Sequence, residues 1–107
     1  MEQKEQEMYT KILGISFEGR QRNIPDLKVG MTGFLEREPD NKFDSNAVKF
    51  MMTINGVDKH LGYLAKMHAV DFAEAMDRGL EYSYTIRDIT GTDAQNKGVN
   101  VSIARVN

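Results

Sequence analysis

The stretch REPDNKFDSNAVKF, residues 37–50, holds more polar side chains than a turn between two strands needs. From its last residues onward, every second position is apolar, at Val48, Phe50, Met52 and Ile54. This alternation predicts a strand over residues 47–54. Just ahead of that strand, Asp44 and Asn46 can hydrogen-bond to their own backbone, which predicts an Asx-type turn. The stretch is therefore either a long structured turn or a binding site.

Two strands are expected upstream of this stretch. The first is predicted by apolar residues that alternate at Leu13, Ile15 and Phe17. Residues 18–30 then form a loop, in which Ile24 and Leu27 act as apolar anchors and Pro25 prevents a long helix from beginning earlier. The second strand is expected over residues 31–37.

Downstream, the Asn55-Gly56 pair predicts a hairpin with a return strand over residues 59–64. The apolar period then becomes helical over residues 66–78, and Gly79 is a C-terminal stop. The expected apolar face of this helix comprises Met67, Val70, Phe72 or Ala73, and Met76. Two more strands follow from two further alternations, Tyr82, Tyr84, Ile86 and Val99, Val101, Ile103.

The order of elements is thus four strands, one helix and two strands, joined mostly by hairpin-length connections. Short connections imply antiparallel neighbours. We expect a mainly β fold with one helix, in which six antiparallel strands form a small, partly open barrel and the helix closes one end. Residues 1–8 are almost wholly polar and are expected to be a flexible tail, which leaves residues 9–107 as a single domain.

Composition excludes several classes of function. The chain has no cysteine and two histidines, which excludes a disulfide framework and a thiolate zinc site, and we expect neither metal nor cofactor. No apolar run approaches the roughly 18 residues of a transmembrane helix, and the polar N-terminus is unlike a signal peptide, so a cytoplasmic location without membrane contact is expected. A net charge of −2 excludes a polycation that coats duplex DNA, so any nucleic-acid role must be local. Arg20 and Arg22 form the main basic cluster.

Catalysis is not expected, because no phosphate-binding loop, nucleophile elbow or His-Glu-x-x-His motif is present. One enzymatic alternative is a magnesium-dependent nuclease built from the carboxylates Glu36, Glu38, Asp40 and Asp44. No catalytic lysine or histidine stands at a matched spacing, and turns often hold such acids to cap backbone groups.

Two long segments, GFLEREPDNKFDSNAVKF (33–50) and HLGYLAKMHAVDFAEAMDRG (60–79), resemble the HIRAN domain. The hallmark of that family is an Arg-Glu-Pro-x-Asn-x-aromatic-Asp-x-Asn-Ala run, followed by a Gly-Tyr-Leu step into a helix. Upstream, ILGISFEGRQ (12–21) is similar to the first strand of the family and the loop after it. The resemblance covers about residues 11–90. It implies an OB-like barrel that captures the 3′ end of single-stranded DNA, as HIRAN domains do in replication-fork remodellers of the SWI2/SNF2 type.

The resemblance also implies roles for individual residues. Phe17 and Phe43 would stack on the terminal bases, and Asp44 would accept a hydrogen bond from the free 3′-hydroxyl. Asn41 would shape the loop around that hydroxyl, and Lys66 would pair with a phosphate. Stacking on an aromatic side chain tolerates any base sequence, and a carboxylate accepts a hydroxyl but repels a phosphate.

The chain departs from the end-binding members of the family at three of these positions. Those members carry tyrosines where Phe17 and Phe43 stand and a basic residue where Ser16 stands, and the last strands offer no match for their pocket aromatic. Ser16 and Arg20 complete the candidate nucleic-acid-binding residues.

The expected function is therefore binding of single-stranded DNA by a monomer, in DNA repair or replication-fork processing, with a helicase or nuclease as the candidate partner. The alternative is a protein-interaction or scaffolding module that has kept the fold without a working DNA pocket and docks through exposed strand edges. Burial of both Phe17 and Phe43, away from any cleft shared with Asp44, would favour this alternative.

Overall fold

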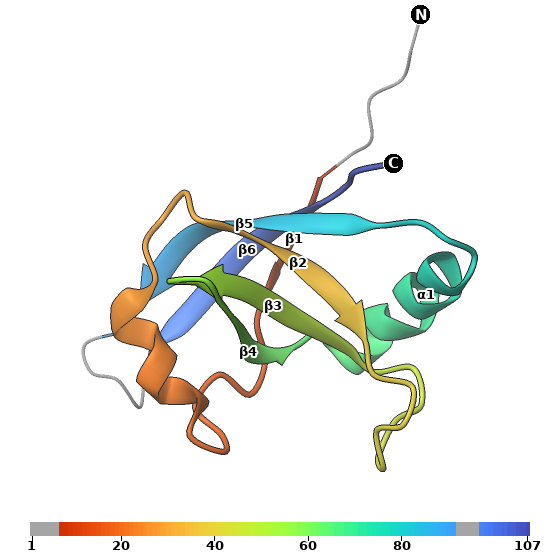
Figure 1. The fold of residues 1–107 in the computed structure, drawn as a ribbon, viewed down its shortest axis with the longest axis horizontal. Coiled ribbons are helices and arrows are strands. Elements are labelled where there is room, and N and C mark those ends of the chain that lie inside the picture. Colours follow the sequence, from red (N-terminus) through yellow and green to blue (C-terminus); the bar gives the residue numbers. More distant parts are fainter. Residues whose placement is uncertain (1–6, 92–96) are drawn as a thin grey trace, which may run out of the picture.

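The structure, a computed structural model, describes residues 7–91 and 97–107 (Figure 1). Its elements are β1 (Met8–Lys11), the 3-10 helix η1 (Arg20–Asp26), β2 (Thr32–Arg37), β3 (Val48–Ile54), β4 (Val57–Tyr63), α1 (Lys66–Asp77), β5 (Tyr82–Thr90) and β6 (Gly98–Arg105). The predicted order of six strands and one α-helix is confirmed, and η1 is an additional short helix. Residues 1–6 of the expected tail lie outside the described residues, whereas Met8 already belongs to β1.

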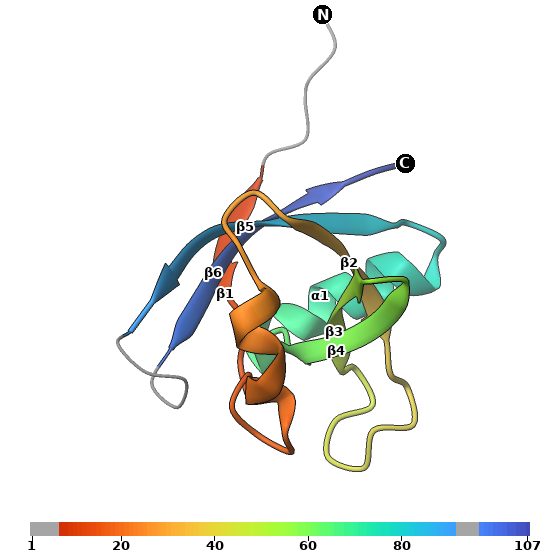
Figure 2. The same ribbon diagram turned by 60° about the vertical axis from the view of Figure 1, so that its left-hand side comes forward.

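All six strands pair antiparallel in one sheet of order β1-β6-β5-β2-β3-β4. Leu13, just after β1, and Tyr63, at the end of β4, exchange two backbone hydrogen bonds of 2.9 and 2.8 Å. The two edges of the sheet therefore meet at one point, and the sheet curls into the partly open, OB-like barrel seen in Figures 1 and 2. Of the described helices, none is long and apolar enough to cross a membrane.

The first strand lies earlier in the chain than its apolar alternation predicted. β1 pairs with β6 over Met8–Lys11, and the chain turns at Gly14, where φ is 73° and the carbonyl accepts the Phe17 N–H at 3.1 Å. Ile12 and Ile15 are buried, but they pack from a turn and not from a strand. The chain can cross β4 there because Gly62 has no side chain: a Cβ at that position would lie 2.4 Å from the Leu13 carbonyl oxygen.

The buried face of α1 agrees with the predicted one at Ala73 and, in part, at Phe72 and Met76, but differs at Met67 and Val70. Ala69, Ala73 and Ala75 are buried, whereas Met67 is 77% exposed and Val70 is 51% exposed. Ala69 and Ala73 belong to the core cluster, and small side chains let a helix approach the barrel closely. The larger side chains Phe72 and Met76 lie beside these alanines, where they are partly buried against the core.

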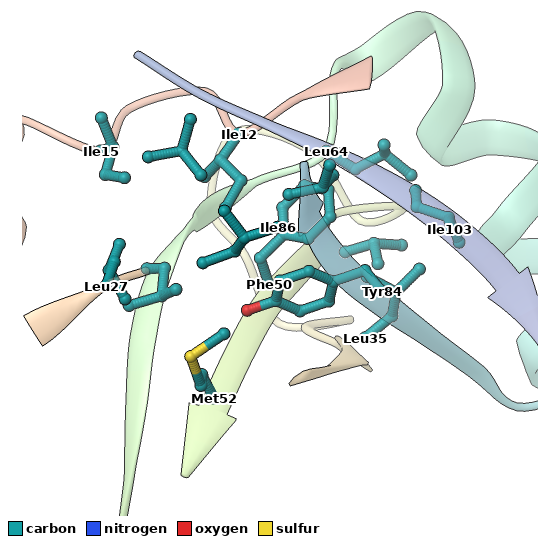
Figure 3. Packing of buried hydrophobic residues seen from close by; sticks show 14 of the residues in the cluster. Ile12, Ile15, Leu27, Leu35, Phe50, Met52, Leu64, Tyr84, Ile86 and Ile103 are labelled. Carbon is teal, nitrogen blue, oxygen red and sulfur yellow. The ribbon is translucent and has the colours of Figure 1, made fainter. Parts of the chain in front are cut away.

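The core fills the barrel as the strand alternations predicted. Phe50 and Tyr84 are fully enclosed and meet edge to face, with ring centroids 5.0 Å apart (Figure 3). The Tyr84 hydroxyl donates a hydrogen bond of 2.9 Å to the Met51 carbonyl, so its polar group is satisfied inside the core. Ile24 and Leu27 of the loop before β2 are buried in the same cluster, which confirms their predicted role as anchors.

Candidate functional site

Two loops project from the same end of the barrel, below the strands in Figures 1 and 2. The first connects β1 to η1 over residues 12–19, and the second connects β2 to β3 over residues 38–47. The first loop turns sharply because Gly14, Glu18 and Gly19 all have left-handed backbone conformations, with φ of 73°, 55° and 81°. The bridge between Leu13 and Tyr63 anchors its base to β4.

The second loop lies within the polar stretch of residues 37–50, and its own side chains hold it in one shape. The Asn41 Oδ1 accepts the N–H groups of Phe43 at 2.8 Å and Asp44 at 3.0 Å. The Asp44 Oδ1 accepts the Asn46 N–H at 2.9 Å, which confirms the predicted Asx-type turn. These bonds fix the backbone on both sides of Phe43, whose side chain is left 88% exposed at the tip.

Glu38 connects this loop to the barrel. Its Oε1 accepts hydrogen bonds from Asn41 Nδ2 at 2.7 Å and from the Tyr63 hydroxyl at 2.6 Å, and Lys49 lies 3.8 Å from Oε2. Burial raises the pKa of the Glu38 carboxyl, but the hydrogen bonds from Asn41 and Tyr63 and the charge of Lys49 outweigh burial and hold this pKa below its usual value. Glu38 is therefore a charged structural acceptor that positions Asn41 and Tyr63.

Tyr63 stands between the two loops. Burial, together with its hydrogen bond to Glu38, raises the pKa of Tyr63 to about 12. The His60 ring packs edge to face against it, with centroids 4.8 Å apart. Burial and the charges of Arg20 and Lys49 lower the pKa of His60, which is therefore neutral at pH 7. The ring of Tyr63 is thus held rigidly from several sides.

Arg20, the first residue of η1, is buried beneath the first loop with 8% of its surface exposed. Its Nε donates to the Gly14 carbonyl at 2.8 Å, and its Nη1 donates to the Glu18 carboxylate at 2.9 Å. The guanidinium carbon lies 5.6 Å from the centroid of the Tyr63 ring, within cation–π range. Arg20 therefore holds the first loop closed and brings positive charge next to the Tyr63 ring.

Two neighbouring grooves open between the loops. The first groove has a volume of about 570 Å³ and is lined by Leu13, Gly14, Phe17, Glu18, Arg20, Asn41, Phe43 and Tyr63. The second groove has a volume of about 250 Å³ and is lined by Asn41, Phe43, Asp44, Ala47, Tyr63, Leu64 and Lys66. Because the two grooves share Asn41, Phe43 and Tyr63, they are two halves of one site.

The structure brings six of the seven sequence-predicted site residues to these grooves. Phe17, which is 68% exposed, and Phe43 line the first groove, while Asp44 and Lys66 line the second. Asn41 lines both, and Arg20 lines the first with its charged group already engaged by Glu18. Ser16 is half-buried and lines neither groove.

Among the lining residues that sequence reasoning missed, two carry a polar group that bears on binding, Tyr63 and Glu18. Tyr63 is part of the Gly-Tyr-Leu step and lines both grooves, so the motif itself contained the signal for it. Glu18 lines the first groove, but its place there depends on the left-handed turn and on its bond to Arg20. No short-range pattern indicates that placement.

The chemistry of the site suits a flat, anionic ligand better than a metal-dependent reaction. Two exposed aromatic side chains offer faces for stacking, and Lys66 at the first turn of α1 offers a positive charge close to the positive end of the helix dipole. Over residues 7–91 and 97–107, no three side chains of the Asp, Glu, His and Cys types are grouped so that they could hold a metal ion. The predicted alternative of a carboxylate metal site is therefore not supported.

A third groove lies on another part of the surface. Its volume is about 460 Å³, and it opens between β2 and the connection from α1 to β5, with Arg37, Met76 and Tyr82 among its lining residues. It shares no residue with the first two grooves. Arg37 is held there by Asp77, with Nε 3.0 Å from Oδ1.

Comparison with known proteins agrees with this architecture. The family model of the HIRAN domain matches residues 6–104 of the chain. The crystal structure of a protein from Lactobacillus plantarum is similar, with a TM-score of 0.74 and 24% identity over 94% of this chain and 92% of that one. The HIRAN domain of human HLTF is similar with a TM-score of 0.67 and 20% identity, over 92% of this chain and 74% of that one. No curated protein matches the chain.

Proposed function

The chain belongs to the HIRAN domain family, which consists of nucleic-acid-binding modules, and we propose that it binds single-stranded DNA with a preference for a free 3′ end. The HIRAN domain is a binding domain and not a catalytic one. One observation carries the proposal. The exposed ring of Phe43 is common to two grooves, one of which contains a second exposed phenylalanine and the other a carboxylate and a lysine.

In this proposal the first groove holds bases. Phe17 and Phe43 are large apolar side chains that the fold leaves in water, at 68% and 88% exposure. Stacking of a base on such a ring contributes about 1–3 kcal/mol and does not depend on sequence. The two rings line one groove, so successive bases near the end of a strand would each find a partner.

The second groove holds the sugar and phosphate of the terminal nucleotide. The Asp44 Oδ1 is engaged by the Asn46 N–H, and the carboxylate can accept a further hydrogen bond from a 3′-hydroxyl with its other oxygen. A 3′-phosphate in the same place would be repelled by that charge. Lys66 lines the same groove and supplies a positive charge for the preceding phosphate.

The wider role is part of the same proposal, because a binding domain acts together with proteins that carry out the chemistry. We propose that it acts in DNA repair or replication-fork processing in the cytoplasm, as a monomer, beside a helicase or nuclease that carries the catalytic activity. The alternative of an interaction module without a DNA pocket is less well supported. Phe17 and Phe43 are both exposed, and the groove of Asp44 adjoins theirs through Phe43.

The test compares an oligonucleotide that ends in a 3′-hydroxyl with the same strand ending in a 3′-phosphate, each labelled at the 5′ end, by fluorescence anisotropy at low salt. We expect the hydroxyl end to bind about tenfold more tightly, because a hydrogen bond to a charged group is worth about 1.5–3 kcal/mol. Equal affinity for the two ends, or binding to neither, refutes end capture.

Two variants separate the proposed roles of the second groove. Asp44→Asn keeps an oxygen for the Asn46 N–H but removes the negative charge, and should therefore lower the ratio of hydroxyl to phosphate affinity. Lys66→Ala should weaken binding to both ends alike. Asp40→Ala is the matched control, because Asp40 is an exposed acid of the same loop that lines neither groove. The reverse pattern would mean that the roles of Asp44 and Lys66 are misassigned.

A further inference from the structure

Glu18 brings a negative charge to the first groove, which Phe17 also lines. Its side chain is 81% exposed, and its Oε1 accepts the Arg20 Nη1 at 2.9 Å. Its Oε2 has no hydrogen-bond partner in the part of the chain that the structure describes. A carboxylate in this position repels a phosphate and is a hydrogen-bond acceptor for anything stacked in the groove.

The backbone does not account for a glutamate at this position. Glu18 has a left-handed conformation, with φ of 55°, immediately before Gly19 at 81°. Glycine or asparagine serves such a turn with less strain, and strained non-glycine residues gather at functional sites. Arg20 is itself 8% exposed and holds Oε1, so the carboxylate is kept at the groove and does not move freely in solvent.

The bases differ in what they offer a carboxylate. Guanine presents two adjacent donors on its Watson–Crick edge, the ring N1–H and the exocyclic amino group, which match the two oxygens of a carboxylate. Cytosine and adenine each present one amino group. Thymine presents a single N3–H between two carbonyl oxygens, which repel the carboxylate. A bidentate contact between a side chain and a base discriminates by about 1–3 kcal/mol.

We propose that Glu18 is a specificity-determining residue that accepts hydrogen bonds from the edge of a base stacked in the first groove, and that it favours guanine over thymine near the 3′ end. This inference rests on the proposed function. It assigns the carboxylate to base edges and leaves the sugar and phosphate to Asp44 and Lys66 in the second groove. Arg20 is a positioning residue that acts through Glu18.

The experiment uses the full chain and four oligonucleotides that share one body and end in two guanines, cytosines, adenines or thymines. We expect guanine ends to bind about fivefold more tightly than thymine ends, the low end of the discrimination that a bidentate contact gives. Glu18→Gln should bring this ratio close to one while binding persists, because the amide replaces one acceptor oxygen by a donor. Glu81→Gln makes the same change of charge on an exposed acid of the third groove and should leave the ratio unchanged.

A second variant tests whether a lost preference is due to the missing carboxylate or to a damaged fold. Glu18→Gly suits the left-handed backbone, which offsets part of the lost ion pair with Arg20, so it should unfold at a temperature close to that of the wild type, and it should also lose the preference. Equal affinity of the wild type for all four ends, or a preference that survives Glu18→Gln and Glu18→Gly, overturns the role of Glu18 and leaves the proposed function intact. Absence of binding to every oligonucleotide overturns both.

Discussion

Replacing Phe43 by alanine should weaken binding while leaving the stability of the fold almost unchanged. The ring is 88% exposed, so the folded protein gains little from burying it. The hydrogen bonds that shape its loop come from its backbone N–H and from the Asn41 side chain, and alanine keeps them. The free energy of unfolding should therefore change by less than about 0.5 kcal/mol, as for other surface substitutions.

The cost to binding should be much larger. Phe43 is common to both grooves, so its loss removes a stacking face worth about 1–3 kcal/mol. Since a factor of ten in affinity corresponds to about 1.4 kcal/mol, Phe43→Ala should weaken binding of single-stranded DNA by about 5- to 150-fold. Fluorescence anisotropy with a labelled oligonucleotide measures this loss, and chemical denaturation of the same samples measures stability.

Val57→Ala is the control for removing an exposed apolar side chain, because Val57 is 52% exposed on the β3–β4 hairpin and lines neither the first nor the second groove. It should leave affinity unchanged. Two results would contradict this role of Phe43: a variant destabilised by more than about 1 kcal/mol, a cost typical of buried positions, or a variant that binds DNA as tightly as the wild type.

Three further predictions concern the structure that supports the grooves. The pKa of Glu38 is lowered from 4.5 in the folded protein, so the charged carboxylate stabilises the fold above pH 4.5. This stabilisation is lost as the pH falls through the folded pKa. A pH series of denaturation curves should therefore show that the free energy of unfolding declines less for Glu38→Gln than for the wild type. Burial raises the pKa of both Tyr63 and Tyr84, so spectrophotometric titration should find two tyrosines that ionise well above 10, and Tyr63→Phe should remove the one with a pKa of about 12. A Tyr63 that ionises near 10 would contradict its burial and its hydrogen bond to Glu38. Gly62→Ala should lower the free energy of unfolding by about 1–3 kcal/mol, because the new Cβ would lie 2.4 Å from the Leu13 carbonyl oxygen. If the variant instead unfolds at the same temperature as the wild type, the two sheet edges do not meet at this point.

Much of the fold was predictable because it depends on residues close together in the chain. Alternating apolar side chains identified β3, β5 and β6, and Asn55-Gly56 identified the hairpin between β3 and β4, where φ is 53° and 80°. The Asx-type turn at Asp44 followed from one short polar segment. In each case the signal and the structure that it specifies lie within a few residues of each other.

The predictions that were wrong concern features that depend on contacts between distant segments. The first strand is β1 at Met8–Lys11 and not the alternation around Ile15, because pairing with β6 decides where a strand forms. The helix buries Ala73 as predicted, but it also turns Ala69 inward and leaves Met67 in solvent, because the space beside the barrel decides which face fits.

The site divides in the same way. The segments 33–50 and 60–79 were enough to place the chain in its family, and the first of them singled out Asn41, Phe43 and Asp44, since a single loop carries all three. Only the tertiary structure joins this loop to Phe17 and Glu18 through Tyr63, and only it buries Arg20 beneath the first loop. A sequence determines local turns by backbone preference, whereas a groove between two loops exists only after the sheet has curled and brought its edges together at Leu13 and Tyr63.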